Sequence, residues 1–376
     1  MTSETDNRTS QRELRRAISE EGSGRRVGLV CLLLLLALAM ALSLDIWMGE
    51  ADVSRIITPA IVARILAHHI PLLGSRIALP VQTPYADTII WQERVPRALS
   101  AALVGMLLAA VGAAFQSLLR NPLADPYTVG IASGAALGSL TVTLAGGAAW
   151  LGGTAPALAA FGSGLLAVGI VFAVARVDGR LSMQTFLLAG IIVGTFFWSL
   201  IPLFVTLGSS EGSNRQARIM ASLFGSLDSM DWNHVLVLLV FGLLGGLSLI
   251  RFASELDIMA FGEETAAHLG VNAEALKRNV VGAGALMTAA AVAAAGIIGF
   301  IGFVTPHAAR RLVGPGHRGL LPAAMLLGGL LLTLSDWLAR VFLHDVPIGV
   351  VTALFGVPLF CLLLRGQLTG AGDRRG

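Results

Sequence analysis

The sequence is poor in charge, since Asp, Glu, Lys and Arg make up 13% of its 376 residues, against about 25% in a typical soluble domain. Hydrophobic residues account for 55%, and the mean hydropathy is +0.78. The chain is also long enough for several bilayer spans of about 20 apolar residues each. These values exclude a soluble enzyme and predict a polytopic membrane protein.

Other absences narrow the function. The two cysteines, Cys31 and Cys361, lie in apolar runs near opposite ends of the chain, so a disulfide is not expected. The scattered basic residues and net charge of +3 give no nucleic-acid footprint. There is no Walker A sequence and no zinc-like Cys/His spacing. His68 and His69 could touch a metal or haem, although a solvated loop pair is the favoured interpretation.

Apolar windows of about 17–25 residues predict about ten membrane spans. The predicted spans are 28–46, 95–118, 127–148, 153–175, 183–207, 233–251, 278–296, 298–312, 319–341 and 348–365. The eighth is short and shares a Gly-rich break near Gly296 and Gly299 with the seventh. The first follows a long polar head, which favours a transmembrane helix over a signal peptide.

The two polar ends are predicted to be cytoplasmic. Residues 1–26 have little to bury and are predicted to be a disordered tail. Residues 27–366 form the membrane domain, and residues 367–376 a second tail. The distribution of Lys and Arg among the short loops favours this orientation, but several arginines then fall on the outer side and need another explanation.

Two segments between spans are too long to be turns. Residues 47–93 are predicted to lie outside as interfacial helix and loop. Residues 252–277 are predicted to lie inside as two short helices joined at Gly262. The inner segment fits an amphipathic interfacial loop and a docking surface for a cytoplasmic partner equally well.

A proline-punctuated stretch, RNPLADP at 120–126, separates the second and third spans. Each proline disfavours helix at the preceding residue, so the stretch predicts a short, rigid hairpin. The third span then opens with small residues, which let helix backbones approach closely. Taken alone, this pattern favours a tight helix pair. The small residues are Gly130, Ser133, Gly134, Ala135 and Gly138.

Several blocks, in order from about residue 91 to 366, resemble the FecCD-type permease subunits of ABC importers for iron chelates and vitamin B12. The blocks are RVPR (94–97), RNPLADPYTVGIASGAALG (120–138), LDIMAFGEETAAHLGV (256–271), GFIGFVTPHAARRLVGPGHRGLLP (299–322), SDWLAR (335–340) and PIGVVTALFGVPLFCLLLR (347–365).

The resemblance implies an all-α, type II ABC importer permease fold with ten transmembrane helices and cytoplasmic termini. It implies a homodimer in the bacterial inner membrane, two cytoplasmic ATPase subunits that bind ATP and Mg²⁺, and a periplasmic substrate-binding protein. The chain itself would be no enzyme and would hold no cofactor or metal.

The resemblance also assigns roles to individual residues. Arg94, Arg97 and Arg340 would meet acidic residues of the binding protein, where a guanidinium offers a fixed fork to a carboxylate; helix-end snorkelling is the alternative. The spacing of Asp336 and Arg340, four residues apart on one helix face, separately predicts that Asp336 orients that arginine.

Three further sets follow from it. The cytoplasmic gate comprises Asn121, Pro122, Leu123, Ser182, Met183 and Gln184. The pathway lining comprises Gly190, Gly194, Thr195, Trp198 and Ser199. The ATPase-coupling contact comprises Met259, Ala260, Gly262, Glu263, Ala266 and Gly270.

The predicted function is therefore the permease of an importer for a ferric chelate, haem or siderophore, with cobalamin as the alternative cargo. An ion-coupled secondary transporter would need buried carboxylates along its path, and Asp336 is the chief candidate. A non-transporting membrane scaffold or receptor is the third class.

Overall fold

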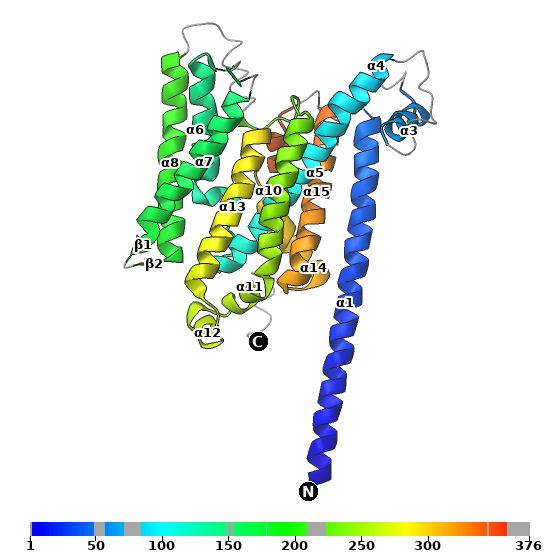
Figure 1. The fold of residues 1–376 in the computed structure, drawn as a ribbon, viewed down its shortest axis with the longest axis vertical. Helices are drawn as coiled ribbons and strands as arrows, with labels where there is room; N and C mark the ends of the chain where they lie inside the picture. The colour runs from blue at the N-terminus through cyan, green and yellow to red at the C-terminus, as the bar shows by residue number, and fades with distance from the viewer. Residues whose placement is uncertain are drawn as a thin grey trace.

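The computed structural model describes residues 2–48, 57–70, 84–147, 150–151, 154–177, 179–208, 223–343 and 346–358. This part of the chain is almost wholly helical (Figure 1). In chain order its elements are α1 (Thr2–Trp47), α3 (Pro59–His68), α4 (Pro84–Asp87), the π-helical η2 (Thr88–Arg94), α5 (Val95–Leu118), the 3-10 turn η3 (Pro126–Val129), α6 (Ile131–Leu144), α7 (Ala155–Ala175), β1 (Arg176–Val177), β2 (Arg180–Leu181), α8 (Met183–Gly208), α10 (Trp232–Arg251), α11 (Ala253–Met259), α12 (Glu263–His268), α13 (Ala273–Ala295), α14 (Ile301–Val313) and α15 (His317–Phe342).

Each of the ten predicted spans contains a helix in the part of the chain that the structure describes, although the third is interrupted at Gly130 and the eighth begins only at Ile301. Seven helical stretches in the described part are long and apolar enough to cross a membrane, namely Gly24–Trp47, Tyr85–Leu118, Ala155–Ala175, Met183–Leu207, Trp232–Arg251, Ala273–Ala295 and His317–Phe342. The other three predicted spans correspond to shorter helices, α6, α14 and Ile348–Pro358. The chain turns sharply before α14, where Gly296 and Phe300 both have positive φ.

The N-terminal head differs from the prediction. The sequence predicts a disordered segment over 1–26, whereas α1 is helical from Thr2 and extends well beyond the bundle (Figure 1). The head has no proline and is rich in Arg and Glu, which are good helix formers. Helix propensity therefore outweighs the lack of apolar residues to bury. The predicted tail at 367–376 lies outside the described residues.

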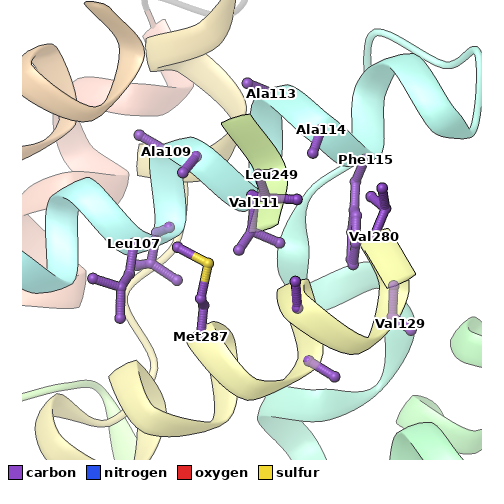
Figure 2. Close-up of a cluster of buried hydrophobic side chains, with 14 of the residues drawn as sticks. Leu107, Ala109, Val111, Ala113, Ala114, Phe115, Val129, Leu249, Val280 and Met287 are labelled. Atoms are coloured by element: carbon purple, nitrogen blue, oxygen red, sulfur yellow. The ribbon is translucent and has the colours of Figure 1, made fainter. Parts of the chain in front are cut away.

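The second span begins earlier than predicted, because α4 and η2 lead without interruption into α5. Helix α5 is the centre of the bundle and packs against α10, α13, α14 and α15. Figure 2 shows its Phe115 beside Val280 and its Leu107 beside Met287 of α13. Lipid tails are as apolar as these side chains, so close packing rather than hydrophobic transfer holds such helices together.

Glycine permits the closest helix contacts. A Cβ atom on Gly138 would lie 1.9 Å from Ser163 Oγ of α7, and one on Gly134 would lie 2.7 Å from Ala167 Cβ. The sequence prediction of a tight helix pair at the start of the third span is therefore confirmed.

The bundle has two distinct ends (Figure 1). The α12 end carries α11, α12, the β1–β2 hairpin and the start of α15, and the N-terminal part of α1 extends beyond it. The α3 end carries α3 and α4. The predicted pair of short helices is confirmed as α11 and α12, which meet at Gly262 with φ +121°. The hairpin, in which Arg176 pairs with Leu181, was not predicted.

Candidate functional site

A cavity of about 640 Å³ opens at the α12 end of the bundle. It gathers residues from the ends of α5 and β2 and from α8, α11, α12 and α13. Its lining is Leu118, Leu119, Arg120, Arg180, Leu181, Ser182, Met183, Gln184, Met259, Glu263 and Lys277. Residues predicted for the gate, Ser182–Gln184, therefore share one space with Met259 and Glu263, which were predicted for coupling.

The RNPL hairpin forms one edge of this cavity through Arg120. The backbone of Arg120 adopts φ +49°, and its N–H donates to Ser117 O at 3.1 Å. Asn121 Oδ1 accepts from Leu123 N at 2.9 Å and closes the turn. The predicted gate residues Asn121, Pro122 and Leu123 thus shape the hairpin but do not line the cavity.

The second proline of the hairpin begins η3, which is capped by Asp125. Asp125 Oδ1 accepts the Tyr127 N–H at 2.9 Å. Burial raises the pKa of the Asp125 carboxyl to about 6, although this hydrogen bond lowers it. The Tyr127 hydroxyl accepts the Ile298 N–H at 3.1 Å, so the hairpin is tied to the turn before α14.

A second cavity of about 350 Å³ lies further along α8. Four predicted pathway residues line it: Gly190, Gly194, Thr195 and Trp198. The fifth, Ser199, is exposed and does not, and its hydroxyl donates to Phe196 O at 2.7 Å. The remaining lining is Tyr127, Thr128, Ala132, Ser133, Ile191 and Ile297.

Gly190 also serves packing. A Cβ atom there would lie 2.5 Å from Thr128 O, so α8 rests directly on η3. Gly190 therefore both lines the second cavity and packs against η3.

The predicted coupling residues separate into two groups. Met259, Gly262 and Ala266 are buried and hold α11 and α12 against the bundle, whereas Ala260, Glu263 and Gly270 are exposed. In this conformation only the exposed residues, Ala260, Glu263 and Gly270, can contact another protein.

Sequence reasoning missed the two largest apolar side chains on this surface. Phe261 is 78% exposed and Leu269 is 65% exposed, one on each side of α12. Phe261 lies in the turn before α12 and Leu269 follows its last residue, so no helical period in the sequence marked them as exposed.

Asp257 and His317 were also missed. Asp257 Oδ1 accepts the His317 N–H at 2.9 Å, and the buried imidazole places its Nε2 2.8 Å from Ser117 Oγ. These contacts tie α11 to α15 and α5, so the short helices are anchored on the central helix.

The three arginines predicted for docking lie near the α3 end and are bound within the chain. Arg94 donates to the carbonyl oxygens of Ile46 and Trp47, at 3.2 and 2.8 Å. Arg340 binds Asp45 of α1. Both side chains are largely buried, so in this conformation neither guanidinium group is accessible to a partner protein.

Arg97 has two carboxylate partners. Its Nη2 lies 2.9 Å from Asp336 Oδ1, and its Nη1 lies 2.9 Å from Asp228 Oδ1. The expectation that Asp336 orients Arg340 is therefore wrong, because Asp45 reaches Arg340 from α1 and leaves Asp336 to Arg97. Asp228 is 60% exposed, which makes it the accessible member of this network.

The adjacent histidines are not equivalent. The His69 ring stacks on Trp91 with centroids 4.0 Å apart, and its Nδ1 is 3.8 Å from Asp87 Oδ1. His69 is thus packed rather than simply solvated. Within the described ranges, no group of three or more His, Cys, Asp or Glu side chains is placed to hold a metal ion.

Comparisons with known proteins agree with this architecture. The FecCD transport family matches residues 32–366. The cobalamin import system permease protein BtuC of Halobacterium salinarum is 38% identical over 301 residues, which cover 79% of each chain. The hemin transport system permease protein HmuU of Yersinia pestis is 37% identical over 287 residues, or 74% of this chain and 84% of that one.

A solved structure of an inward-facing metal-chelate type ABC transporter matches with a TM-score of 0.75 at 28% identity. The match covers 90% of this chain and 99% of that chain. A family match over most of the sequence, two relatives above one third identity and a shared fold lead to one conclusion. The chain is a multi-pass membrane protein that belongs to the FecCD transport family of ABC transporter permeases.

Proposed function

We propose that this permease subunit carries an iron chelate, haem or a ferric siderophore, which a periplasmic binding protein delivers and ATP hydrolysis on separate subunits drives. One observation supports the mechanism above all. The 640 Å³ cavity joins Ser182–Gln184 at the start of α8 to Met259 and Glu263 of the short helices. A partner that moves those helices would therefore act directly on the wall of the cavity.

The cargo assignment rests on relatives and on the lining of the α8 cavity. Relatives are named for hemin and for Fe(3+)-citrate. The lining around Trp198 and Tyr127 contains no charged side chain. Such a wall suits a bulky chelate that must pass without being held tightly. Cobalamin is the second candidate, favoured by the relative that is 38% identical.

Two copies of the chain would enclose the path. Helix α8 carries a row of exposed apolar side chains on the flank next to its cavity, which supports apposition of a second copy there. The row comprises Leu188, Ile191, Ile192, Phe196 and Leu203. No cofactor is assigned to this subunit, and ATP and Mg²⁺ would bind on the partner ATPase.

The ATPase contact would involve the exposed surface of α12. Phe261 and Leu269 supply apolar area there, and Glu263 supplies charge. A short helix with projecting apolar residues fits a cleft on a partner, in the manner of a helix seated in a groove.

The binding protein would dock at the α3 end, around Arg97. Its acidic side chains would compete with Asp228, the exposed partner of that arginine. Charges at such a rim mainly set the encounter rate and the register of the two proteins.

The ion-coupled alternative has less support. Asp336 and Asp45 are buried in the described bundle, and each is bound by an arginine. A carboxylate fixed in this way is a poor proton carrier.

Transport assays test the proposal. The permease, its ATPase and its binding protein are reconstituted in vesicles, and ATP-dependent uptake of haem, a ferric siderophore and cobalamin is compared. Uptake of an iron chelate supports the assignment. Selective cobalamin uptake would establish the second candidate, and uptake driven by an ion gradient without ATP would contradict both.

Topology requires its own test, because the termini and α12 are proposed to lie in the cytoplasm of a bacterial inner membrane. A cysteine at exposed Thr265, in a chain with Cys31 and Cys361 replaced by serine, should resist an impermeant thiol reagent in spheroplasts, whose inner membrane is exposed and intact. It should react once that membrane is permeabilised. Labelling of the intact spheroplasts would overturn this orientation.

A further inference from the structure

A lysine is buried beside the 640 Å³ cavity. The side chain of Lys277, in the second turn of α13, is 2% exposed. Lysine is almost never buried unless it is paired, and the positive end of the helix dipole near the start of α13 disfavours a cation. Stability of α13 itself therefore does not account for a lysine at this position.

Three acceptors surround the ammonium group. Lys277 Nζ lies 2.7 Å from Glu263 Oε1, 2.8 Å from Glu274 Oε1 and 2.8 Å from Leu181 O. An ammonium group has three N–H donors, so this arrangement uses all of them. The acceptors come from α12, α13 and β2, which makes Lys277 the point where three elements meet.

The link to the hairpin is double. Glu274 Oε2 accepts the Leu181 N–H at 3.0 Å, while Lys277 binds the carbonyl of the same residue. Leu181 immediately precedes Ser182–Gln184, the predicted gate residues at the start of α8. The backbone there is therefore fixed to the start of α13 through both of its polar groups.

The link to α12 depends on one side chain. Glu263 is the first residue of α12, and its side chain is 52% exposed. Helix α12 has six residues, too few to be stable without tertiary contacts. The ion pair with Lys277 gives this helix a fixed position relative to β2.

We propose that Lys277 is a positioning residue that joins α12 to the start of α8, so that a displacement of α12 moves the gate. The inference rests on the proposed function in one respect, that α12 is the element the ATPase moves. It goes beyond it by naming the contact that transmits the movement: Glu263 to Lys277 to the carbonyl of Leu181.

Three substitutions in the assembled transporter test the role. Lys277→Met removes the ammonium group and retains an unbranched apolar stem. Lys277→Arg retains the charge and several donors. Arg278→Met removes a cation from the next, exposed position of the same helix and is the matched control.

The primary readout is chelate uptake per ATP hydrolysed. Lys277→Met should bind the ATPase and hydrolyse ATP, with uptake per ATP reduced by about 5- to 150-fold, the range typical of coupling between sites. Lys277→Arg should recover most of it, and Arg278→Met should retain the wild-type ratio. A wild-type ratio in Lys277→Met, or an equal loss in Arg278→Met, would overturn the proposal.

A second pair of variants covers the case in which Lys277→Met does not fold. Glu263→Ala cuts the link from its exposed side and leaves Lys277 with Glu274 and Leu181, and Glu264→Ala is its exposed neighbour and control. Loss of uptake per ATP only in Glu263→Ala, with ATPase binding and ATP hydrolysis retained, supports the link, and equal behaviour of the two variants contradicts it.

A distance measurement separates this inference from the cargo assignment. Spin labels at Thr265 of α12 and Arg180 of β2, in one labelled protomer per complex, should give one narrow distance that ATP does not change. The distribution should broaden in Lys277→Met. If the wild-type complex imports no chelate, the cargo is wrong, whereas an unchanged narrow distance in Lys277→Met refutes the positioning role.

Discussion

Arg97 binds the buried carboxylate of Asp336, which lies 239 residues further along the chain, with Nη2 2.9 Å from Oδ1 and Nε 3.0 Å from Oδ2. This two-pronged contact joins α5 to α15 near the α3 end of the bundle. The remaining terminal nitrogen of Arg97 binds exposed Asp228, so one guanidinium has an inner and an outer partner.

Loss of the inner partner should be costly. Asp336→Ala removes the buried carboxylate partner of the Arg97 guanidinium, and breaking a buried pair typically costs about 3–5 kcal/mol. Asp228→Asn, at an exposed carboxylate, should cost at most about 1 kcal/mol. Denaturant unfolding of the purified protein in detergent measures both, and equal losses would contradict the assigned burial.

Loss of the outer partner should favour docking. If an acidic group of the binding protein competes with Asp228 for Arg97, Asp228→Asn should tighten binding by up to about fivefold, the worth of an exposed ion pair. Asp231→Asn removes a nearby negative charge that does not touch Arg97 and is the control. Binding to the reconstituted permease is measured at low and high salt, and equal effects of both variants would refute competition at Arg97.

Gly138 should tolerate no side chain. A methyl group there would meet Ser163 Oγ and Ala159 O at 1.9 and 2.5 Å, so Gly138→Ala should destabilise the protein by about 1–3 kcal/mol or more through overpacking. Gly162→Ala is the control, because a Cβ at that position meets nothing within 4 Å. It should be neutral or stabilise by up to about 1 kcal/mol. Thermal unfolding of both variants and the wild type measures these changes, and equal stability of the two variants would contradict the prediction.

Asp125 should make stability depend on pH. Its pKa in the folded chain is raised from 3.8 to about 6 by burial, so above pH 6 the ionised carboxyl destabilises the fold. As pH falls from 7 toward 4, the folded state binds this proton first and gains stability relative to the unfolded chain. Asp125→Asn retains the oxygen that accepts the Tyr127 N–H but cannot titrate. The stability of the wild type relative to this variant should therefore rise on acidification, by about 1–3 kcal/mol.

Asp231 is a control, because its effect on stability should change with pH in the opposite direction to that of Asp125. Burial raises the pKa of this carboxyl, but hydrogen bonds from His234 outweigh that effect and lower it overall. The wild type should therefore lose stability relative to Asp231→Asn as the pH falls through the acid range. Unfolding midpoints between pH 7 and pH 2 test both residues, because the Asp125 effect develops above pH 4 and the Asp231 effect develops below it. Parallel curves for the two pairs would refute the assignments.

The ATPase contact should depend on exposed apolar side chains rather than on buried ones. Phe261→Asp combined with Leu269→Asp should abolish co-purification of the ATPase while the permease still folds, because neither side chain packs in the bundle. Phe261→Leu combined with Leu269→Met keeps the surface apolar and should retain the complex. Full assembly of the Asp variant would remove α12 from the interface.

The sequence predicts most of the architecture because hydrophobic run length directly reflects the thickness of the bilayer. Each of the ten predicted spans contains a helix among the described residues, and Gly262 separates α11 from α12 as expected. Run length carries no information about partners across the bundle. Asp336 was assigned to Arg340 from their spacing on one helix, whereas the structure pairs it with Arg97 of α5.

The candidate site shows the same division. The positions of the prolines predict the RNPL hairpin. The gate residues Ser182–Gln184 come from the resemblance to the FecCD family. Lys277 was overlooked because a cation at the start of a span reads as a topology signal. Only its three acceptors, contributed by separate elements, distinguish it from exposed Arg278.

The pairing of Asp45 with Arg340 also bears on biosynthesis. Helix α1 carries a buried carboxylate, Asp45, whose cation is translated 295 residues later. Until α15 has entered the bilayer, Asp45 is an acid without this cation at the end of an apolar helix, which is energetically unfavourable in lipid. A prematurely terminated chain therefore keeps this carboxyl without its arginine, so its first helix should be held in the bilayer less stably than in the finished protein.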